Sequence, residues 1–265
     1  MDIRDEDLRA IARLWHELAE IPAARGDEAM AHCFAQLARI IGAGNVFWVG
    51  AVRESPEPDP ADGLRGWRSR AVRHLHRDPA RDRIVASILR QFKANVVDPQ
   101  TTALVVGAGT TRALLRRDVV DDETWERSWV VNEAMRPIGV EYRLIGAHAV
   151  DAARESYVGL DRGPRERPFA ERERDLLHLF LLGGPGFHRE QLLAHAPARP
   201  PLTAREQSVL RLLLTDFTER EIGAALGLTP RTTHQYVVAI LKKFGVKGRV
   251  GLMAYWLRHG RDGAP

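Results

Sequence analysis

Apolar side chains recur three or four positions apart in several stretches of the first 200 residues. Residues 5–20 and 27–41 show this spacing most clearly, and it returns in a segment opened by Asp78 and Pro79 and in residues 170–182. Side chains so spaced share one face of a helix, so each stretch is predicted to be an amphipathic helix. GGPG is expected to break the last of them before FHREQLLAH resumes it.

Runs typical of β-strands lie between these helices. They are residues 45–52, 65–76, 102–107, 142–150 and 156–160. Alternation in the second run puts Trp67, Ala71 and Leu75 on one face and arginines and histidines on the other. No helix separates the first two runs, and only DAARE separates the last two, so both pairs are predicted to be antiparallel. Helices flanking an antiparallel sheet make this part of the chain α+β.

Residues 201–265 contain three helix starts. Thr203 and Thr218 each precede a glutamate at the spacing of a capping box, and Thr229 precedes a proline. Gly227 and Gly245 follow the second and third helices, where a left-handed residue closes a helix. A further apolar helix follows, so an all-α four-helix domain is predicted. Its small core is expected from Leu202, Val209, Leu210, Leu213, Ile222, Ala225, Leu226, Val237, Ile240, Leu241 and Phe244.

The second and third of these helices are joined only by Gly227 and Leu228, as in a helix-turn-helix. In that motif the second helix enters the major groove of DNA, with its N-terminal residues against the bases. Positive charge gathers in the same region. Residues 201–265 hold ten Arg and Lys against five Asp and Glu, a net +5, whereas the full chain carries +4. A DNA-binding unit is therefore predicted at this end of the chain.

Three motifs make the prediction more specific. They are L-T-x-R-E-x-x-V-L at 202–210, E-I-x-x-x-L-G-L-T at 221–229 and T-T-x-x-Y-V-x-x-I-L-K-K-F-G-V at 232–246. This pattern resembles the C-terminal DNA-binding domain of LuxR-type transcriptional regulators. The family usually has Val, His and Glu where this chain has Thr233, Tyr236 and Gly251.

The resemblance implies which side chains contact DNA. Three would face the bases: His234, Gln235 and Val238. Four would grip the backbone: Thr229, Arg231, Lys242 and Lys243. Thr232, Thr233 and Lys247 complete the predicted site. The alternative is that the helical unit binds protein and that its charges form a solvated face.

The proline-rich HAPARPP suggests a short, semi-rigid linker. The predicted domains are residues 1–193, a linker at 194–201, and the helix-turn-helix domain at 202–262. The charged start MDIRDEDLRA lacks an apolar signal segment, and no run reaches the ~18 apolar residues of a membrane span. A cytoplasmic protein without a membrane partner is expected. Cys33 is the only cysteine, which excludes an intrachain disulfide and favours a buried structural thiol.

The order of elements in residues 1–193 is similar to that of GAF and PAS-like sensor domains, by architecture alone. If the analogy holds, a ligand pocket lies on one face of the sheet. The candidate lining residues are Trp48, Trp67, Tyr142, His148 and Tyr157, for each of which a place in the core is the alternative. The tryptophan and tyrosine pattern of the acyl-homoserine-lactone sensors is not recognised, so that ligand is not assigned.

Other chemistry finds less support in the sequence. A phosphorelay receiver needs a lysine across from clustered acids, and Lys93 is the only lysine before residue 242. His74 and His76 lack a third metal ligand, so an exposed polar face is favoured. GAGTTR has Arg112 where a dinucleotide fingerprint needs glycine, so a turn is favoured. With no nucleophile elbow, zinc motif or acid pair, no enzyme, cofactor or metal site is predicted.

Together these patterns predict a sequence-specific transcriptional regulator, whose N-terminal sensor or dimerisation domain controls the helix-turn-helix. Its predicted partners are double-stranded DNA, an unknown small-molecule effector and a second copy of the chain. The second copy is expected because one short helix covers few bases. A first alternative is a sensor whose helical domain binds protein, such as RNA polymerase, and shows no salt-sensitive duplex binding. A second is an enzyme fused to a helix-turn-helix, which predicts turnover by residues 1–195.

Overall fold

The computed structural model describes residues 3–22, 25–54, 58–76, 78–195 and 202–259. The chain divides into two compact units, residues 1–196 and 197–265, which are described separately below. The predicted linker overlaps residues 196–201, which lie outside the described residues. Within the described ranges, every helix is too short or too polar to cross a membrane.

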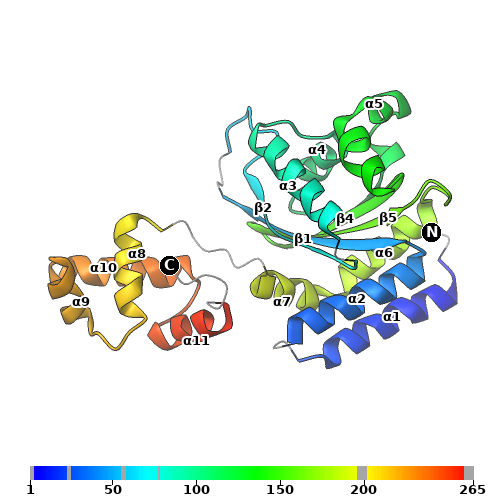
Figure 1. Ribbon diagram of the computed structural model, residues 1–265. Helices are drawn as coiled ribbons and strands as arrows, with labels where there is room; N and C mark the ends of the chain where they lie inside the picture. The colour runs from blue at the N-terminus through cyan, green and yellow to red at the C-terminus, as the bar shows by residue number, and fades with distance from the viewer. Residues whose placement is uncertain (1–2, 23–24, 55–57, 77, 196–201, 260–265) are drawn as a thin grey trace. The chain divides into compact units, whose positions relative to one another are not determined.

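The first unit is built on a five-stranded sheet with the strand order β2-β1-β5-β4-β3 (Figure 1). Its strands are β1 Asn45–Arg53, β2 Trp67–His74, β3 Arg112–Leu115, β4 Tyr142–Asp151 and β5 Arg154–Arg162. Each neighbouring pair is antiparallel. The predicted pairings of β1 with β2 and of β4 with β5 are therefore confirmed, as is the α+β class.

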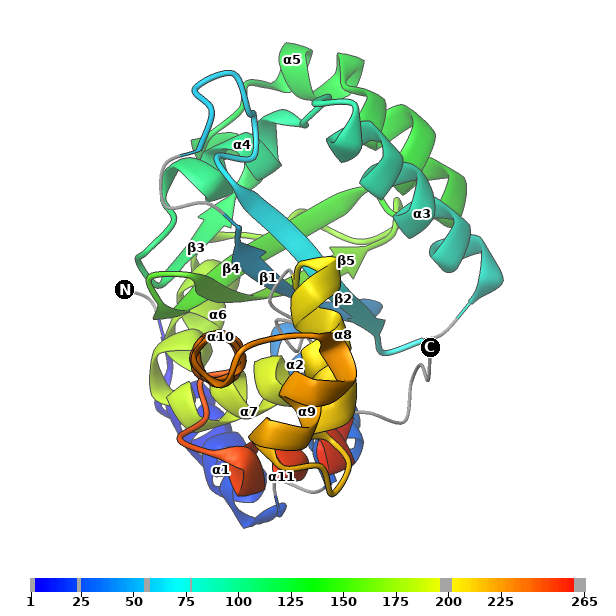
Figure 2. The ribbon, with the colours of Figure 1, turned by 90° about the vertical axis from the view of Figure 1, so that its left-hand side faces the viewer.

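Helices cover both faces of this sheet (Figures 1 and 2). One face carries α1 Asp5–Glu20, α2 Gly26–Ile41, α6 Glu171–Gly183 and α7 Pro185–His195. The other carries α3 Pro79–Lys93, α4 Pro99–Val106 and α5 Asp122–Arg127. The short turns η2 Arg116–Asp118, η3 Val130–Met135 and η4 Arg136–Ile138 complete this second layer.

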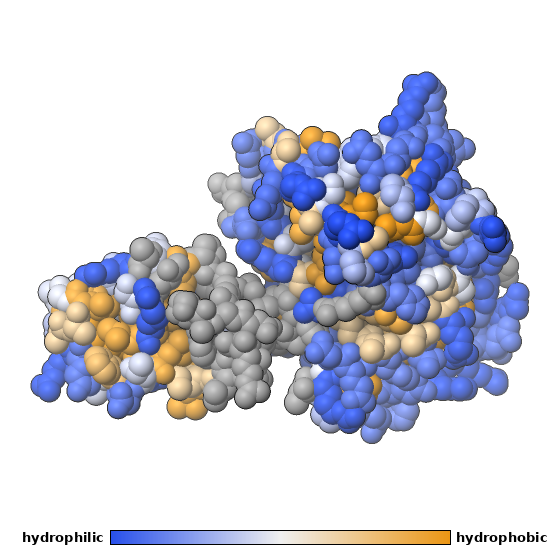
Figure 3. Space-filling model, viewed as in Figure 1, coloured by the Kyte–Doolittle hydropathy of each residue, from blue (hydrophilic) through white to orange (hydrophobic). Residues whose placement is uncertain are grey.

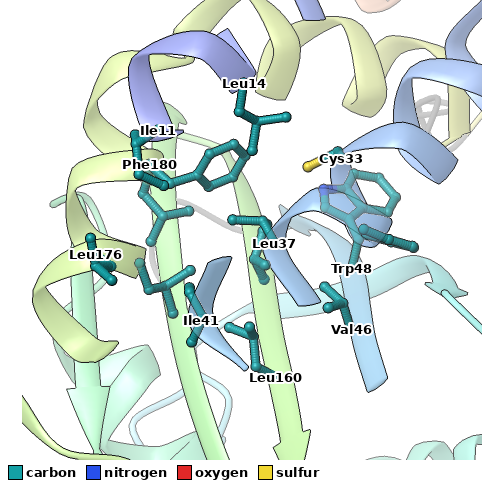
Figure 4. Close-up of a cluster of buried hydrophobic side chains, with 14 of the residues drawn as sticks. Ile11, Leu14, Cys33, Leu37, Ile41, Val46, Trp48, Leu160, Leu176 and Phe180 are labelled. Atoms are coloured by element: carbon teal, nitrogen blue, oxygen red, sulfur yellow. The ribbon is translucent and has the colours of Figure 1, made fainter. Parts of the chain in front are cut away.

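The main core lies between the sheet and the layer of α1, α2 and α6 (Figure 4). Ile11, Leu37, Trp48 and Phe180 have no exposed surface there. Each such side chain contributes roughly 1.5–3 kcal/mol relative to an exposed one. Cys33 is buried among them, and burial raises the pKa of its thiol, which agrees with the predicted structural role.

Two predictions about the sheet are wrong. Residues 102–107, predicted as a strand, lie almost wholly in α4, because Asp98 caps a helix start by accepting the amide of Thr101 at 2.9 Å. The second prediction placed Trp67 and Ala71 on the same face of β2. However, the pairing of β2 with β1 shifts by one residue between Gly50 and Ala51. Such a bulge moves the following side chains to the opposite face. Ala71 consequently packs against the main core, away from the cluster that contains Trp67.

In its described part, residues 202–259, the second unit has the four helices that were expected: α8 Ala204–Leu213, α9 Glu219–Leu226, α10 Pro230–Lys243 and α11 Arg249–His259. Val209, Ile222 and Ile240 are fully buried in its core. Ala225, predicted to join them, is exposed. Gly223 is buried in its place, because its missing side chain lets α10 approach α9 closely.

Candidate DNA-binding surface and ligand cavity

Side-chain caps fix where the helices of the second unit begin. Thr203 and Glu206 exchange reciprocal hydrogen bonds of 3.2 and 2.7 Å, and Thr218 and Glu221 repeat the arrangement at 3.3 and 2.7 Å. The hydroxyl of Thr229 accepts the amide of Thr232 at 3.2 Å to open α10. These bonds satisfy amides that the first helical turn leaves free. The predicted helix starts are confirmed.

The turn between α9 and α10 depends on a left-handed glycine. Gly227 has φ of 62°, and its amide continues the hydrogen bonding of α9 to Ala224. A side chain at this φ would strain the backbone, so glycine permits the chain to reverse within two residues. The tight connection exposes the first turns of α10.

One stripe of α10 is exposed along its whole length. Its members recur at helical spacing on the side away from the core: Arg231, His234, Gln235, Val238 and Lys242. Val238 is apolar yet 49% exposed. Two positive ends with a polar and an apolar centre form a surface of the kind that binds a DNA groove.

Two of the predicted contact residues, His234 and Lys243, have carboxylate partners on other helices of the unit. The Nδ1 atom of His234 lies 3.1 Å from a carboxylate oxygen of Glu219 at the start of α9. The ammonium of Lys243 donates to Glu206 at 2.7 Å, and this bond holds the pKa of the Glu206 carboxyl below its usual range. Lys243 therefore ties α10 to the cap of α8 in addition to any role at a phosphate.

Thr233 does not belong to the exposed stripe. Its side chain is fully buried, and its hydroxyl donates to the Thr229 carbonyl at 3.0 Å. A Cβ added to Gly223 would lie 2.9 Å from this hydroxyl. Thr233 thus packs where α9 and α10 cross, and the prediction that it contacts DNA does not fit its burial. The other predicted residues, Thr229, Thr232 and Lys247, retain exposed surface.

The first unit contains a cavity of about 160 Å³ between the sheet and the layer of α3 and α4. Its walls are mainly apolar, from side chains such as Val49, Ile88 and Leu104, and two of the candidate pocket residues, Trp67 and Tyr157, belong to its lining. Figure 3 shows apolar residues between hydrophilic ones on the surface around α3.

Three other predicted pocket residues do not line this cavity. Trp48 is buried on the opposite face of the sheet and donates to Ser156 at 2.7 Å. Tyr142 packs against the same core. His148 stacks on His188 of α7 with 4.7 Å between ring centroids. The aromatic character of these residues serves the core, because alternation along each strand turns them away from α3.

Sequence reasoning missed a polar cluster at one end of the cavity. Arg81 from α3, His74 from β2 and Arg143 from β4 line it, beside the buried Asp161 of β5. Arg143 donates to Asp161 at 2.8 Å, whereas the nearest nitrogen of Arg81 is 3.6 Å from that carboxylate. A signal was present, since an arginine interrupts the apolar run 142–150. A charge in such a run is costly unless it is paired.

His74 is not the exposed polar residue that was predicted. Both of its ring nitrogens are buried without a hydrogen-bond partner. The pKa of His74 is lowered to about 4, mainly by burial and in part by the two arginines, against the opposing effect of Asp161. The ring is therefore neutral at pH 7. Gln100 at the start of α4 also lines the cavity with a buried, unpartnered Nε2.

Comparison with known proteins identifies relatives of the second unit. Residues 200–256 match the family described as "Bacterial regulatory proteins, luxR family". Over 63 residues the chain is 36% identical to the spore germination protein GerE of Bacillus subtilis, covering 24% of this chain and 85% of that protein. Over 57 residues it is 40% identical to the transcriptional regulatory protein UhpA of Salmonella typhimurium, covering 22% of this chain and only 29% of UhpA.

Among solved structures, the chain is similar to SdiA in complex with octanoyl-rac-glycerol. The identity is 15% and the TM-score 0.49, over 98% of this chain and 99% of that one. Escherichia coli SdiA in another structure gives 15% and 0.48, over 94% and 96% of the two chains.

Proposed function

We propose, from the premise that this chain belongs to the luxR family of bacterial regulatory proteins, that it is a sequence-specific DNA-binding transcriptional regulator. Residues 202–262 bind the duplex with α10 in the major groove. Residues 1–193 bind a small-molecule effector in the cavity beneath α3 and thereby control how residues 202–262 bind DNA. The protein acts as a dimer on paired half-sites in the cytoplasm, without catalysis.

The observation that carries the proposal is the exposed stripe of α10. A protein-binding helix buries an apolar face against its partner, whereas Val238 is the only strongly apolar member of this stripe. Arg231 and Lys242 stand at its two ends, where they reach the phosphates on either side of a groove. His234 and Gln235 lie between them and supply hydrogen bonds to base edges.

The first test measures binding of the full chain to a duplex pool with a randomised site, over a series of salt concentrations. If each subunit meets about four phosphates, the logarithm of the affinity should fall with that of salt at a slope near −4. Binding that is equally strong to an unrelated polyanion, or independent of salt, would favour the alternative in which the helical unit binds protein.

Two variants separate base readout from phosphate contact. Gln235→Ala should relax the preference at one base pair, a loss of about 1–3 kcal/mol of discrimination. Arg231→Ala should weaken all sequences alike and reduce the salt slope by about one. Arg13→Ala, an exposed arginine of α1, serves as the charge-matched control and should change neither. An unchanged base preference in Gln235→Ala would remove this side chain from the readout.

A further inference from the structure

The polar end of the cavity carries more positive than negative charge. Arg81 and Arg143 each expose only 15% of their side chains, and between them lies a single carboxylate, that of Asp161, which is 2% exposed. Asn45, the remaining partner of this carboxylate, is neutral and donates at 3.1 Å. Asp82, which also affects the titration of His74, is exposed on the outside of α3. Two nearly buried cations thus share one anion.

Hydrogen-bonding capacity at this end is unused as well. The Nη1 atom of Arg81 is buried and has no hydrogen-bond partner, and both nitrogens of the neutral His74 are in the same condition. Buried polar groups are rarely left unpaired, because each costs about 1–3 kcal/mol. An unbalanced positive charge in a partly buried site adds to this cost. The cluster therefore offers excess positive charge and free donors to an anionic group.

The rest of the cavity is lined mainly by apolar side chains, with a few polar ones such as Gln100 and Thr101 at the start of α4. Helix α3 presents Ile84, Ile88 and Phe92 to it, yet within α3 no side chain is fully buried. Beneath them the floor continues along β1 from Phe47 to Ala51, a span of roughly 13 Å at the usual rise of an extended strand. An apolar chain lying along this floor would complete the packing of α3.

We propose that this cavity takes an anionic amphipathic molecule, a carboxylate on an unbranched apolar chain, with its head between Arg81, Arg143 and His74. The arginines donate to the carboxylate, and the guanidinium of Arg143 is already placed over the ring of Phe47, 4.8 Å from its centroid. The N–H of the neutral imidazole supplies a third donor. This inference rests on the proposed sensor function of the first unit and specifies its ligand class.

The test titrates the full chain with decanoate, and with methyl decanoate and decanol as neutral probes of equal chain length. Trp67 and Trp125 line the cavity, so the intrinsic fluorescence of the protein reports occupancy. Because hydrogen bonds to a charged group are worth about 1.5–3 kcal/mol, decanoate should bind roughly tenfold or more tightly than either neutral probe.

Variants distinguish a charged head site from general apolar binding. Arg81→Met should weaken decanoate roughly tenfold while leaving methyl decanoate nearly unchanged. Because Arg81 makes no hydrogen bond through its buried Nη1, this substitution should fold, and thermal unfolding verifies that. Arg83→Met, on the exposed side of α3, is the matched control. Asp161→Asn should strengthen decanoate binding, because it removes the competing anion.

The outcomes separate the two proposals. Equal affinity for decanoate and its methyl ester, or equal losses of both in Arg81→Met, would overturn the anionic head site and leave an apolar sensor. Binding of none of the three probes would overturn the ligand class too, and a thermal-shift screen of other small molecules would then test the sensor function by itself. Neither result bears on DNA binding, which the duplex titration measures independently.

Discussion

Thr233 lies next to the exposed stripe of α10 but is buried beneath it. Its hydroxyl and its amide both donate to the Thr229 carbonyl, at 3.0 and 2.9 Å, so loss of the hydroxyl leaves no buried acceptor unpaired. Thr233→Val should therefore change the free energy of unfolding by less than about 1 kcal/mol. It should also leave the selected DNA sequence unchanged. Site selection and thermal unfolding of the variant check both, and an altered base preference would contradict the buried role.

His188 of α7 makes the stability of the first unit depend on pH. Burial lowers the pKa of His188 well below 6.5, and the neighbouring His148 lowers it further. The Ser156 hydroxyl accepts from Trp48 at 2.7 Å and lies 2.8 Å from Nδ1 of His188, so its own proton is available to Nδ1 in the neutral tautomer that carries its hydrogen on Nε2. Below about pH 6.5 the His188 ring binds a proton in the unfolded chain but stays neutral in the folded protein. The contribution of His188 to the stability of the folded unit is therefore fully present above about pH 6.5 and is lost as the pH drops below it.

The variant His188→Asn tests this dependence, since its side-chain oxygen can still accept from Ser156. Its unfolding temperature should fall less than that of the parent protein between pH 7.5 and pH 5. His16→Asn, at an exposed position of α1, is the matched control and should follow the parent. Identical pH profiles for the parent and His188→Asn would show that His188 titrates alike in both states.

At the residue scale the sequence predicts what local geometry determines. The threonine caps and Gly227 act within three or four positions of their partners, so the residue pattern suffices. The roles of Thr233 and His148 depend on which face another helix covers, which spacing within one element cannot show. Arg81, His74 and Arg143 come from three separate elements, and only the folded sheet brings them together.

At the scale of elements, competition between start signals explains the main errors. TALVVG is apolar and β-branched, and it was predicted as a strand. The pair Asp98 and Pro99 just before it starts a helix, and the capping bond to Thr101 decides the outcome. The bulge in β2 could not be predicted from the sequence either, because the alternation of side chains does not show where a strand contains an extra residue. Helices α1, α2, α6 and α10 were predictable because their apolar stripes extend over several turns.

Strand β5 owes its fit against β1 to a glycine, which leads to a prediction about the cavity. A Cβ on Gly159 would lie 2.0 Å from the ring of Phe47, so Gly159→Ala must displace that ring. Such overpacking should destabilise the unit by about 1–3 kcal/mol. Because Phe47 lines the cavity, displacement of its ring should also weaken decanoate binding. Chemical denaturation and the fluorescence titration measure the two effects.

A second substitution identifies the cause. In a Phe47→Ala background the added methyl group has no ring to meet, so Gly159→Ala should cost little there. The cycle of single and double variants isolates the coupling between the two positions. If Gly159→Ala were equally destabilising in both backgrounds, backbone conformation rather than the Phe47 ring would be responsible.

At the scale of the whole molecule, the net charge and the helix signals of the sequence both change near residue 200, and the structure contains two compact units, residues 1–196 and 197–265. The first unit can regulate the second only if ligand binding in the first changes the affinity of the second for DNA. That requirement is thermodynamic, since a ligand shifts an equilibrium only by its differential affinity for the two states. It can be measured without knowing the path by which the units communicate.

The resulting prediction concerns both ligands together. If decanoate changes the affinity for the selected duplex by some factor, typically 5–150-fold for about 1–3 kcal/mol of coupling, the duplex must change the affinity for decanoate by the same factor. Titrations in both orders measure the two factors. Arg81→Met should keep the affinity for DNA in the absence of decanoate but lose the response to it at concentrations that saturate the parent. A duplex affinity that decanoate leaves unchanged, although fluorescence shows the cavity occupied, would mean that ligand binding in the first unit does not control the helix-turn-helix.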